Sequence, residues 1–414
     1  MKIRINKLIL CALAMAIGSF AAQAQYSTTP YSRVGYGILN DNASGIQRSM
    51  GGVGIAMQNG RQVNVMNPAS YACVDSLTFL WDLGFDLSNV WSSETGKSGH
   101  SFSGGLDYIT TQFRITKGLG GSFGLLPYSN VGYSYAAKLD NGAEARMGEG
   151  GLSKLYVGLG YSPVKGLSFG VNVGYLFGTI ANTTLVVGNS TAMFQRSLEI
   201  RDYDVNAGLQ YAFNVSPKDR IVLGATYTPR KSYHGHTWGI YYDETIDIEA
   251  DTVGYGSLKG SHEQAESYGA GISYAHGDRL MVEADFLYQP WSKAKYTKLE
   301  GFEGSSTTLG DRWKAAFGLS YTPNSRGAYY KRMTYRVGAF YNHDYLNIQG
   351  NNVRDYGVGI GFTFPAPSSK TLVNLGLEWR HRYSAPTVYI TEDYLNITLS
   401  VNFNELWFWK NKIR

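Results

Sequence analysis

The sequence predicts an all-β fold, a 14-stranded antiparallel transmembrane β-barrel plugged by an N-terminal hatch. The first observation is alternation: many segments of about ten residues, the length of a tilted strand that crosses a bilayer, place apolar side chains on one parity and small or polar ones on the other. The second is composition, because 32 Tyr, 18 Phe, 8 Trp and 50 Gly against only 11 Pro are typical of aromatic girdles and close-packed strands.

The clearest strand runs between Gly166 and Gly178. A helix could not separate its apolar residues from its small ones, whereas a strand does so automatically. Its apolar parity carries Leu167, Phe169, Val171, Val173, Tyr175 and Phe177. The same pattern predicts strands at residues 77–88, 106–115, 121–135, 154–162, 167–177, 203–213, 221–227, 268–274, 280–288, 313–321, 335–341, 356–364, 373–379 and 395–403.

The second of these strands changes phase near Ile109, which indicates a β-bulge. Connections are short after every even strand and longer after nearly every odd one, the rhythm of bacterial outer-membrane barrels, with short turns on the periplasmic side. A soluble β-sandwich would also alternate, but its outward face would be polar. The pattern therefore favours a barrel in the bacterial outer membrane, in contact with membrane lipids.

The N-terminus has the features of a signal peptide, residues 1–24. Lys2, Arg4 and Lys7 precede an apolar run, and Ala22-Gln23-Ala24 offers small residues for cleavage. Cleavage would leave 34 of the 37 basic residues against 32 acidic ones, a net charge of +2, so nucleic acid is not an expected partner. Only Cys73 would remain, so no intramolecular disulfide is expected.

Residues 25–76 do not alternate and are rich in glycine. They contain Ser49-Met-Gly-Gly-Val-Gly-Ile-Ala56 and Asn67-Pro68-Ala69. In a loose periplasmic tail Val53 and Ile55 would be exposed, so a compact periplasmic or luminal hatch is the better interpretation. The chain then divides into the signal peptide, the hatch at 25–76, the barrel at 77–406 and a periplasmic tail at 407–414. The hatch residues singled out are Arg33, Arg48, Gly51, Gly52, Asn67, Pro68 and Ala69.

The inward parity of the strands is unusually rich in glycine. Glycine within a strand marks either the close approach of other backbone, here that of the hatch, or the curvature of the barrel, and both explanations stay open. Other inward positions are polar, including Asp82, Glu283, Glu378 and Arg380. They could pair with Arg33, Arg48 and Arg61 of the hatch, or be hydrated.

The third predicted strand carries Pro127 at its centre. Proline cannot donate a ladder hydrogen bond, so this position requires an edge, a bulge or a gap. We expect a kink that opens the wall toward the bilayer, with Gly124, Pro127, Tyr128, Ser129 and Asn130 at the opening; a tolerated bulge without an opening is the alternative. Continuous pairing of the second and third strands on both sides of Pro127 would contradict an opening.

No enzyme, cofactor or metal site is predicted. A barrel phospholipase needs Ser and His at neighbouring lipid-facing positions, whereas the histidines fall mainly in loops and turns. His234 and His236 flank Gly235 in what we expect to be an extracellular loop, and the acidic run from Asp243 to Asp251 follows them. Both are better explained as solvated loop residues than as metal ligands.

Taken together, Ser49–Ala56, Asn67-Pro68-Ala69, the interrupted third strand and the ending Asn402-Phe-Asn-Glu-Leu-Trp-Phe408 resemble the long-chain fatty acid transporter family of outer-membrane proteins, especially members from Bacteroidetes. The resemblance implies passive transport of hydrophobic small molecules such as long-chain fatty acids, with lateral exit through the third-strand kink. Related barrels of the type IX secretion machinery imply an alternative, in which the partner is a secreted protein or a secretion component.

Overall fold

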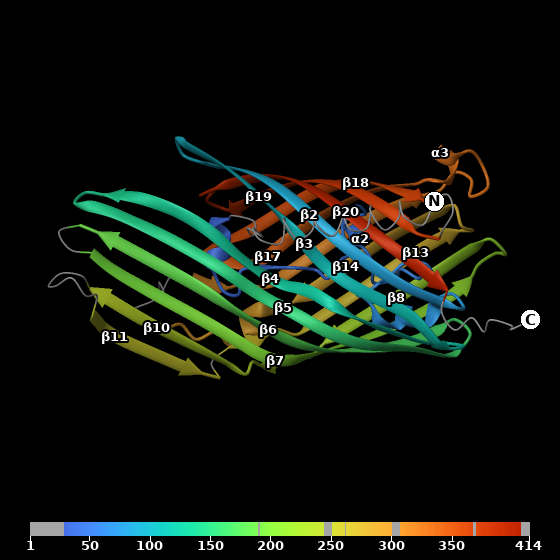
Figure 1. Cartoon of the computed structure of the whole chain (residues 1–414), viewed down its shortest axis with the longest axis horizontal. Helices are drawn as coiled ribbons and strands as arrows, with labels where there is room; N and C mark the ends of the chain where they lie inside the picture. Colours follow the sequence, from blue (N-terminus) through green and yellow to red (C-terminus); the bar gives the residue numbers. More distant parts are fainter. Residues whose placement is uncertain are drawn as a thin grey trace, which may run out of the picture.

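The computed structural model describes residues 29–188, 191–243, 251–260, 262–299, 307–366 and 370–406. The predicted signal peptide, the predicted tail and most of the acidic run lie outside these residues. Fourteen antiparallel strands form a closed wall (Figure 1). They are β2 (Thr78–Glu94), β3 (Lys97–Thr116), β4 (Leu119–Leu139), β5 (Gly142–Val164), β6 (Leu167–Val187), β7 (Thr191–Asn214), β8 (Asp219–Thr228), β13 (Ser267–His276), β14 (Leu280–Gln289), β16 (Arg312–Tyr321), β17 (Thr334–Ile348), β18 (Asn351–Pro365), β19 (Leu372–Ala385) and β20 (Thr391–Leu406).

Each wall strand pairs with its neighbours in the chain, and β20 pairs with β2 from Thr78 to Ser93 to close the barrel. The fourteen predicted strands correspond one to one to these, which confirms the predicted 14-stranded antiparallel barrel. Several strands are longer than predicted: β6 continues past Phe177 to Val187, and β4, β5 and β7 extend beside it (Figure 1). In these extensions both faces mix polar and apolar residues, so the alternation that reveals a strand fades.

The remaining elements are short or lie beyond the wall. Among the described residues, no helix is long and apolar enough to cross a membrane. The strands β10 and β11 extend the sheet beyond β7, as Figure 1 shows. These elements are η1 (Pro30–Arg33), β1 (Ile38–Leu39), α2 (Gly45–Arg48), η2 (Pro68–Cys73), β9 (Lys231–Ser232), β10 (Gly235–Asp243), β11 (Asp251–Lys259), β12 (Glu263–Gln264), η3 (Trp291–Lys293), β15 (Thr307–Leu309) and α3 (Tyr329–Arg332).

The outer face of the wall is an apolar belt. Along β6, Phe169, Val171, Val173 and Tyr175 are exposed, while the residues between them are buried. This is the parity that the sequence predicts, and it is the surface expected of a barrel that faces lipid. The predicted bulge near Ile109 is also confirmed, because the β2–β3 register shifts where Gly84 pairs with Tyr108 but Phe85 pairs with Leu106.

The described residues 29–76 pack against the inner face of the wall. Met50, Val53 and Ala56 are fully buried, and their neighbours are inward residues of the strands. Inward glycines mark the points of contact: a Cβ on Gly170 would lie 2.2 Å from the carbonyl carbon of Pro68, and one on Gly338 would lie 2.0 Å from that of Met50. Of the two explanations for these glycines, close approach of the N-terminal backbone accounts for them directly.

Candidate functional site: a break between β3 and β4

The wall is interrupted between β3 and β4. Their pairing begins near the turn at residues 117–118 and ends at the pair Ile109–Leu125, whereas β4 stays paired with β5 as far as Leu139. A bulge at Tyr128 separates the pairs Pro127–Ser153 and Ser129–Leu152 on the β5 side. The two strands are therefore paired on only one side of Pro127. Of the five predicted residues, Gly124 lies within the paired part and the other four lie beyond it.

The N-terminal segment covers the edge of β4 that β3 leaves free. β1 pairs with β4 through Ile38–Asn130 and Leu39–Ser129. The backbone N–H of Thr29 donates to the carbonyl oxygen of Gly132 at 2.7 Å, and that of Asn40 to the carbonyl of Tyr128 at 3.0 Å. In the described part of the chain, no strand pairs with the opposite edge of the break, β3 from residue 97 to 108.

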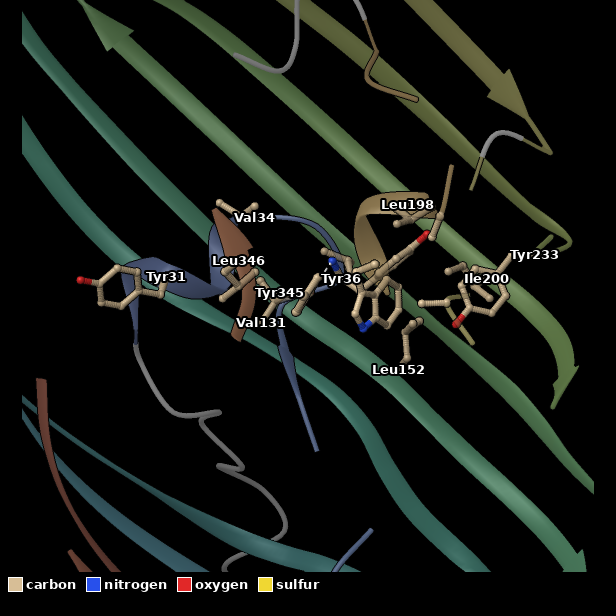
Figure 2. Packing of buried hydrophobic residues seen from close by; sticks show 14 of the residues in the cluster. Tyr31, Val34, Tyr36, Val131, Leu152, Leu198, Ile200, Tyr233, Tyr345 and Leu346 are labelled. Atoms are coloured by element: carbon tan, nitrogen blue, oxygen red, sulfur yellow. Dashed lines mark hydrogen bonds between the residues drawn. The ribbon is translucent and has the colours of Figure 1, made fainter. Parts of the chain in front are cut away.

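A buried apolar cluster lies inside the barrel next to the edge of β4 that β3 leaves free (Figure 2). Tyr31, Val34 and Tyr36 of the N-terminal segment meet inward side chains of β4 to β7 and of β17. Val131 and Leu152 come from the two strands at the bulge, and both are buried. The cluster comprises Tyr31, Val34, Tyr36, Val131, Tyr133, Leu152, Leu176, Ile180, Leu198, Ile200, Tyr233, Ala265, Trp291, Ala294, Tyr345, Leu346 and Val353.

Beyond the apolar cluster, ion pairs hold the N-terminal segment. Asp41 contacts both Arg312 and Lys314 of β16, and Lys314 Nζ donates to Asp41 Oδ2 at 2.7 Å. Burial alone would raise the pKa of the Asp41 carboxyl, but the two cations hold it well below its usual range. This carboxylate is therefore ionised at any physiological pH.

The glycine-rich motif is held through its backbone. The N–H groups of Gly54 and Ile55 donate to Asp285 Oδ2 at 2.7 and 2.9 Å, and the N–H of Ala56 donates to Glu283 Oε1 at 2.8 Å. Gly51 and Gly52 have positive φ, which lets the chain turn tightly against β16 and β17. The predicted luminal residue Glu283 is thus an anchor of the segment.

Asn67-Pro68-Ala69 fixes the other end of the segment. The Asn67 side chain accepts from the N–H of Ala69 at 3.1 Å and donates to the carbonyl oxygen of Ile55 at 2.7 Å. The backbone of Pro68 contacts the wall at Gly160 and Gly170. The motif therefore joins the two halves of the segment and seats them on β5 and β6.

The three predicted hatch arginines behave differently. Arg48 contacts Asp107 and lies 3.7 Å from Asp86, as the sequence suggests. For the other two arginines the sequence left pairing and hydration open, and among the described residues neither forms an ion pair with a barrel carboxylate. Arg33 donates to the hydroxyl of Tyr135, and Arg61 forms an exposed pair with Asp75 of its own segment.

The other predicted luminal residues do not contact the N-terminal segment through ion pairs. Glu378 and Arg380 pair with each other at 2.9 Å on β19, and Arg380 also lies 3.8 Å from Asp355. Asp82 is fully buried on β2, opposite Thr110 of β3. These residues form a polar lining rather than a binding constellation.

Two cavities lie on either side of the Asp41 ion pair. One, of about 120 Å³, has a mixed lining that includes Leu39, Tyr128, Trp291 and Lys154. The other, of about 150 Å³, is lined mainly by polar and charged groups, including Arg48, Asp344, Asp355 and Arg382. The mixed cavity adjoins both the bulge and β1. Among the described residues, no group of three His, Cys, Asp or Glu could hold a metal ion.

Sequence reasoning missed Asp41, Tyr36, Trp291 and Tyr345. The only signal for Tyr36 is its position between Gly35 and Gly37, both of which have positive φ. Nothing local marks Asp41 or Trp291, since their partners lie in distant parts of the chain. His262, which faces Tyr36 at a ring distance of 6.3 Å, was also missed. Burial, helped by Arg196 and Lys295, lowers the pKa of His262 to about 4, so it is neutral at physiological pH.

The fold defines the class of this protein: it is a closed 14-stranded antiparallel barrel that matches solved FadL-like barrels. The chain belongs to the BamG family, whose model matches residues 4–414. A search of curated proteins finds no match. Similar solved structures include the toluene transporter TodX of P. putida (TM-score 0.62, 13 % identity, 89 % of this chain and 100 % of that one).

Two further structures show the same likeness. They are a FadL homologue of Pseudomonas aeruginosa (TM-score 0.63, 12 % identity, 88 % and 99 % covered) and the toluene transporter TbuX of Ralstonia pickettii (TM-score 0.57, 16 % identity, 88 % and 99 % covered). At these identities the likeness establishes the fold. The predicted resemblance to the fatty acid transporter family is thereby confirmed for the fold.

Proposed function

We propose that this protein lies in the bacterial outer membrane and carries hydrophobic small molecules across it by passive diffusion. The observation that carries the proposal is the end of β3–β4 pairing at Ile109–Leu125, beside an apolar cluster and a cavity inside the wall. A hydrophobic molecule that entered from the outside could leave sideways into the lipid there, without crossing the charged interior. The names of the similar structures support this class of cargo.

In this proposal, residues 25–76 act as a hatch. The part from Ser49 to Ala69 is seated on the wall by buried hydrogen bonds and stays in place. The part from Thr29 to Asn40 closes the break and is the part that moves. It is joined to β4 by the two residue pairs of β1 and a few further hydrogen bonds.

The polar interior restricts the route. Asp41, Arg312 and Lys314 separate the two cavities, and desolvating such groups for an apolar cargo would be costly. Long-chain fatty acids and small hydrocarbons both remain candidates for the cargo. A cavity of about 120 Å³ suits a ring-sized molecule better than a whole long chain, since a cavity of roughly 150 Å³ is known to hold benzene.

Uptake tests this function. Radiolabelled toluene and oleate would be supplied to cells of an outer-membrane-bearing host with and without the protein, and accumulation would be followed over time. We expect faster accumulation of at least one compound when the protein is present. This function would be excluded if cells with and without the protein accumulated each compound at the same rate, with the folded barrel verified in the membrane fraction.

A second function, binding an exported polypeptide, is favoured by one observation. The edge of β3 from residue 97 to 108 has no strand beside it in the described part of the chain, and an open strand edge accepts an added strand. Cysteine cross-linking from Ser101 or Ser103 to a co-expressed secreted protein would support this alternative. Absence of any such adduct would leave transport as the function.

A further inference from the structure

Tyr36 fills a pocket made of aromatic side chains. Its ring is fully buried, and the ring centroids of Tyr233, Trp291 and Tyr296 lie 5.6, 5.6 and 5.5 Å away. Tyr233 and Tyr296 meet it edge to face, at interplanar angles of 83° and 87°. These are the distances and angles at which aromatic rings attract one another, so the pocket is shaped for one six-membered ring.

The pocket also recognises the hydroxyl group of that ring. The Tyr36 hydroxyl donates to the carbonyl oxygen of Glu263 at 3.0 Å. Glu263 lies in β12, outside the wall, so this acceptor is fixed by the pairing of β12 with β9. A ring without a hydroxyl group would leave this carbonyl without its donor in a part-buried site, which costs free energy.

The walls and the occupant come from different parts of the chain. Tyr233 and His262 lie between β8 and β13, and Trp291 and Tyr296 lie between β14 and β15. Tyr36 belongs to the segment that covers the break. The pocket would therefore keep its walls if that segment came away from β4.

The local backbone directs Tyr36 into this pocket. Gly35 and Gly37 have φ of +61° and +84°, and a Cβ on Gly37 would lie 2.4 Å from the carbonyl oxygen of Asn130. The Tyr345 hydroxyl contacts both sides of this turn: it accepts from the N–H of Tyr36 at 3.0 Å and donates to the carbonyl oxygen of Gly37 at 2.5 Å. The turn at Gly35-Tyr36-Gly37 thus places the phenol ring of Tyr36 in the pocket, in the position that a bound phenol would occupy.

We propose that this pocket is a binding site for a small phenol, and that Tyr36 is an internal ligand that an external phenol displaces. The external ring would stack among Tyr233, Trp291 and Tyr296 and donate its hydroxyl hydrogen to Glu263. This inference rests on the proposed function in one respect, the path by which the phenol reaches the pocket. The same release of residues 29–40 from β4 opens both the break and the pocket.

The test uses fluorine NMR of 4-fluorophenol, with fluorobenzene as the matched probe that lacks a hydroxyl group, on the full barrel in detergent. We expect saturable broadening of the 4-fluorophenol signal that p-cresol reverses, and weaker or no saturable broadening for fluorobenzene. Detergent without protein corrects for partitioning into micelles. Equal saturable binding of both probes, or none of 4-fluorophenol, would overturn the proposal.

Two variants tie the signal to displacement of Tyr36. Tyr36→Phe loses one internal hydrogen bond, so 4-fluorophenol should bind about 2- to 10-fold more tightly than to wild type. Tyr335→Phe, at a hydroxyl bonded to the carbonyl oxygen of Tyr330 on the barrel surface, is the matched control and should leave the affinity unchanged. An unchanged affinity for Tyr36→Phe would contradict displacement.

A disulfide provides the second check. Leu39 and Ser129 are directly paired across β1 and β4, so Leu39→Cys with Ser129→Cys, in a Cys73→Ser background, should join the segment to the wall. The oxidised protein should lose 4-fluorophenol binding and regain it on reduction. Binding by the oxidised form would overturn the proposal. If phenol binding fails while toluene or oleate uptake persists, the inference is wrong and the proposed function stands.

Discussion

Ile109 and Leu125 are the last residues that pair β3 with β4, and beyond them the two strands separate. In the described residues, every other neighbouring pair of wall strands is joined over most of the shorter strand. Since backbone groups left unpaired in lipid are costly, such a break persists only where something else compensates for it. On the β4 side that compensation is β1, and this arrangement underlies the predictions below.

The first prediction concerns backbone protection on β3. In the described part of the chain, residues 97–108 have a partner strand on one side only, so we expect peptides from this part to exchange with deuterium faster than peptides from residues 109–116. Hydrogen–deuterium exchange followed by mass spectrometry measures this difference. Uniform protection along β3 would contradict the end of β3–β4 pairing at Ile109–Leu125.

The second prediction concerns contact between glycines and the N-terminal segment. Gly170→Ala would place a methyl group 2.2 Å from the Pro68 backbone, so we expect destabilisation of about 1–3 kcal/mol and faster exchange of residues 60–73. Gly99→Ala is the control, because a Cβ there meets nothing within 4 Å. Equal exchange in the two variants would favour barrel curvature as the reason for Gly170.

The third prediction concerns the ion pairs of Asp41. Asp41→Asn leaves Arg312 and Lys314 buried without their anion, at a cost of about 3–5 kcal/mol, and should expose residues 36–48 to exchange. Asp75→Asn, which removes the partner of exposed Arg61, is the control and should cost at most about 1 kcal/mol. Protection of residues 36–48 that is unaffected by Asp41→Asn would contradict this account.

The same carboxylate sets a pH dependence. The pKa of Asp41 in the folded protein lies well below its usual value of about 3.9, so its stabilisation is complete above that value and is lost as pH falls through the folded pKa. The difference in protection between wild type and Asp41→Asn should therefore stay constant from pH 8 to 5 and shrink only in stronger acid. A difference that disappears near pH 6 would show that another group controls the segment.

The fourth prediction concerns the anchor of the glycine-rich motif. Asp285→Ala leaves the N–H groups of Gly54 and Ile55 without an acceptor, each at a cost of about 1–3 kcal/mol, and should lower the thermal unfolding midpoint. Asp278→Ala, in the exposed turn of the same hairpin, should have little effect. Similar midpoints for the two variants would show that Asp285 does not anchor the motif.

The wall was predictable because an exposed apolar face and a buried face alternate strictly along the strands, as in β6 from Leu167 to Phe177. Pro127 predicted an edge, a bulge or a gap in the third strand because its missing N–H is a local property, and the β4–β5 register shifts between Pro127 and Ser129. The partners of the N-terminal segment were not predictable in the same way. Asp41 meets Arg312, 271 positions away, and Tyr36 meets rings from two separate loops, so no local periodicity connects them.

The most direct test of lateral transport is uptake through the barrel that carries Leu39→Cys and Ser129→Cys in the Cys73→Ser background. If the hatch must leave β4, oxidation should abolish the protein-dependent uptake of toluene or oleate, and reduction should restore it. The Cys73→Ser protein without the two added cysteines should be insensitive to both treatments. Uptake that continues at the same rate in the fully oxidised protein would contradict exit through the break between β3 and β4.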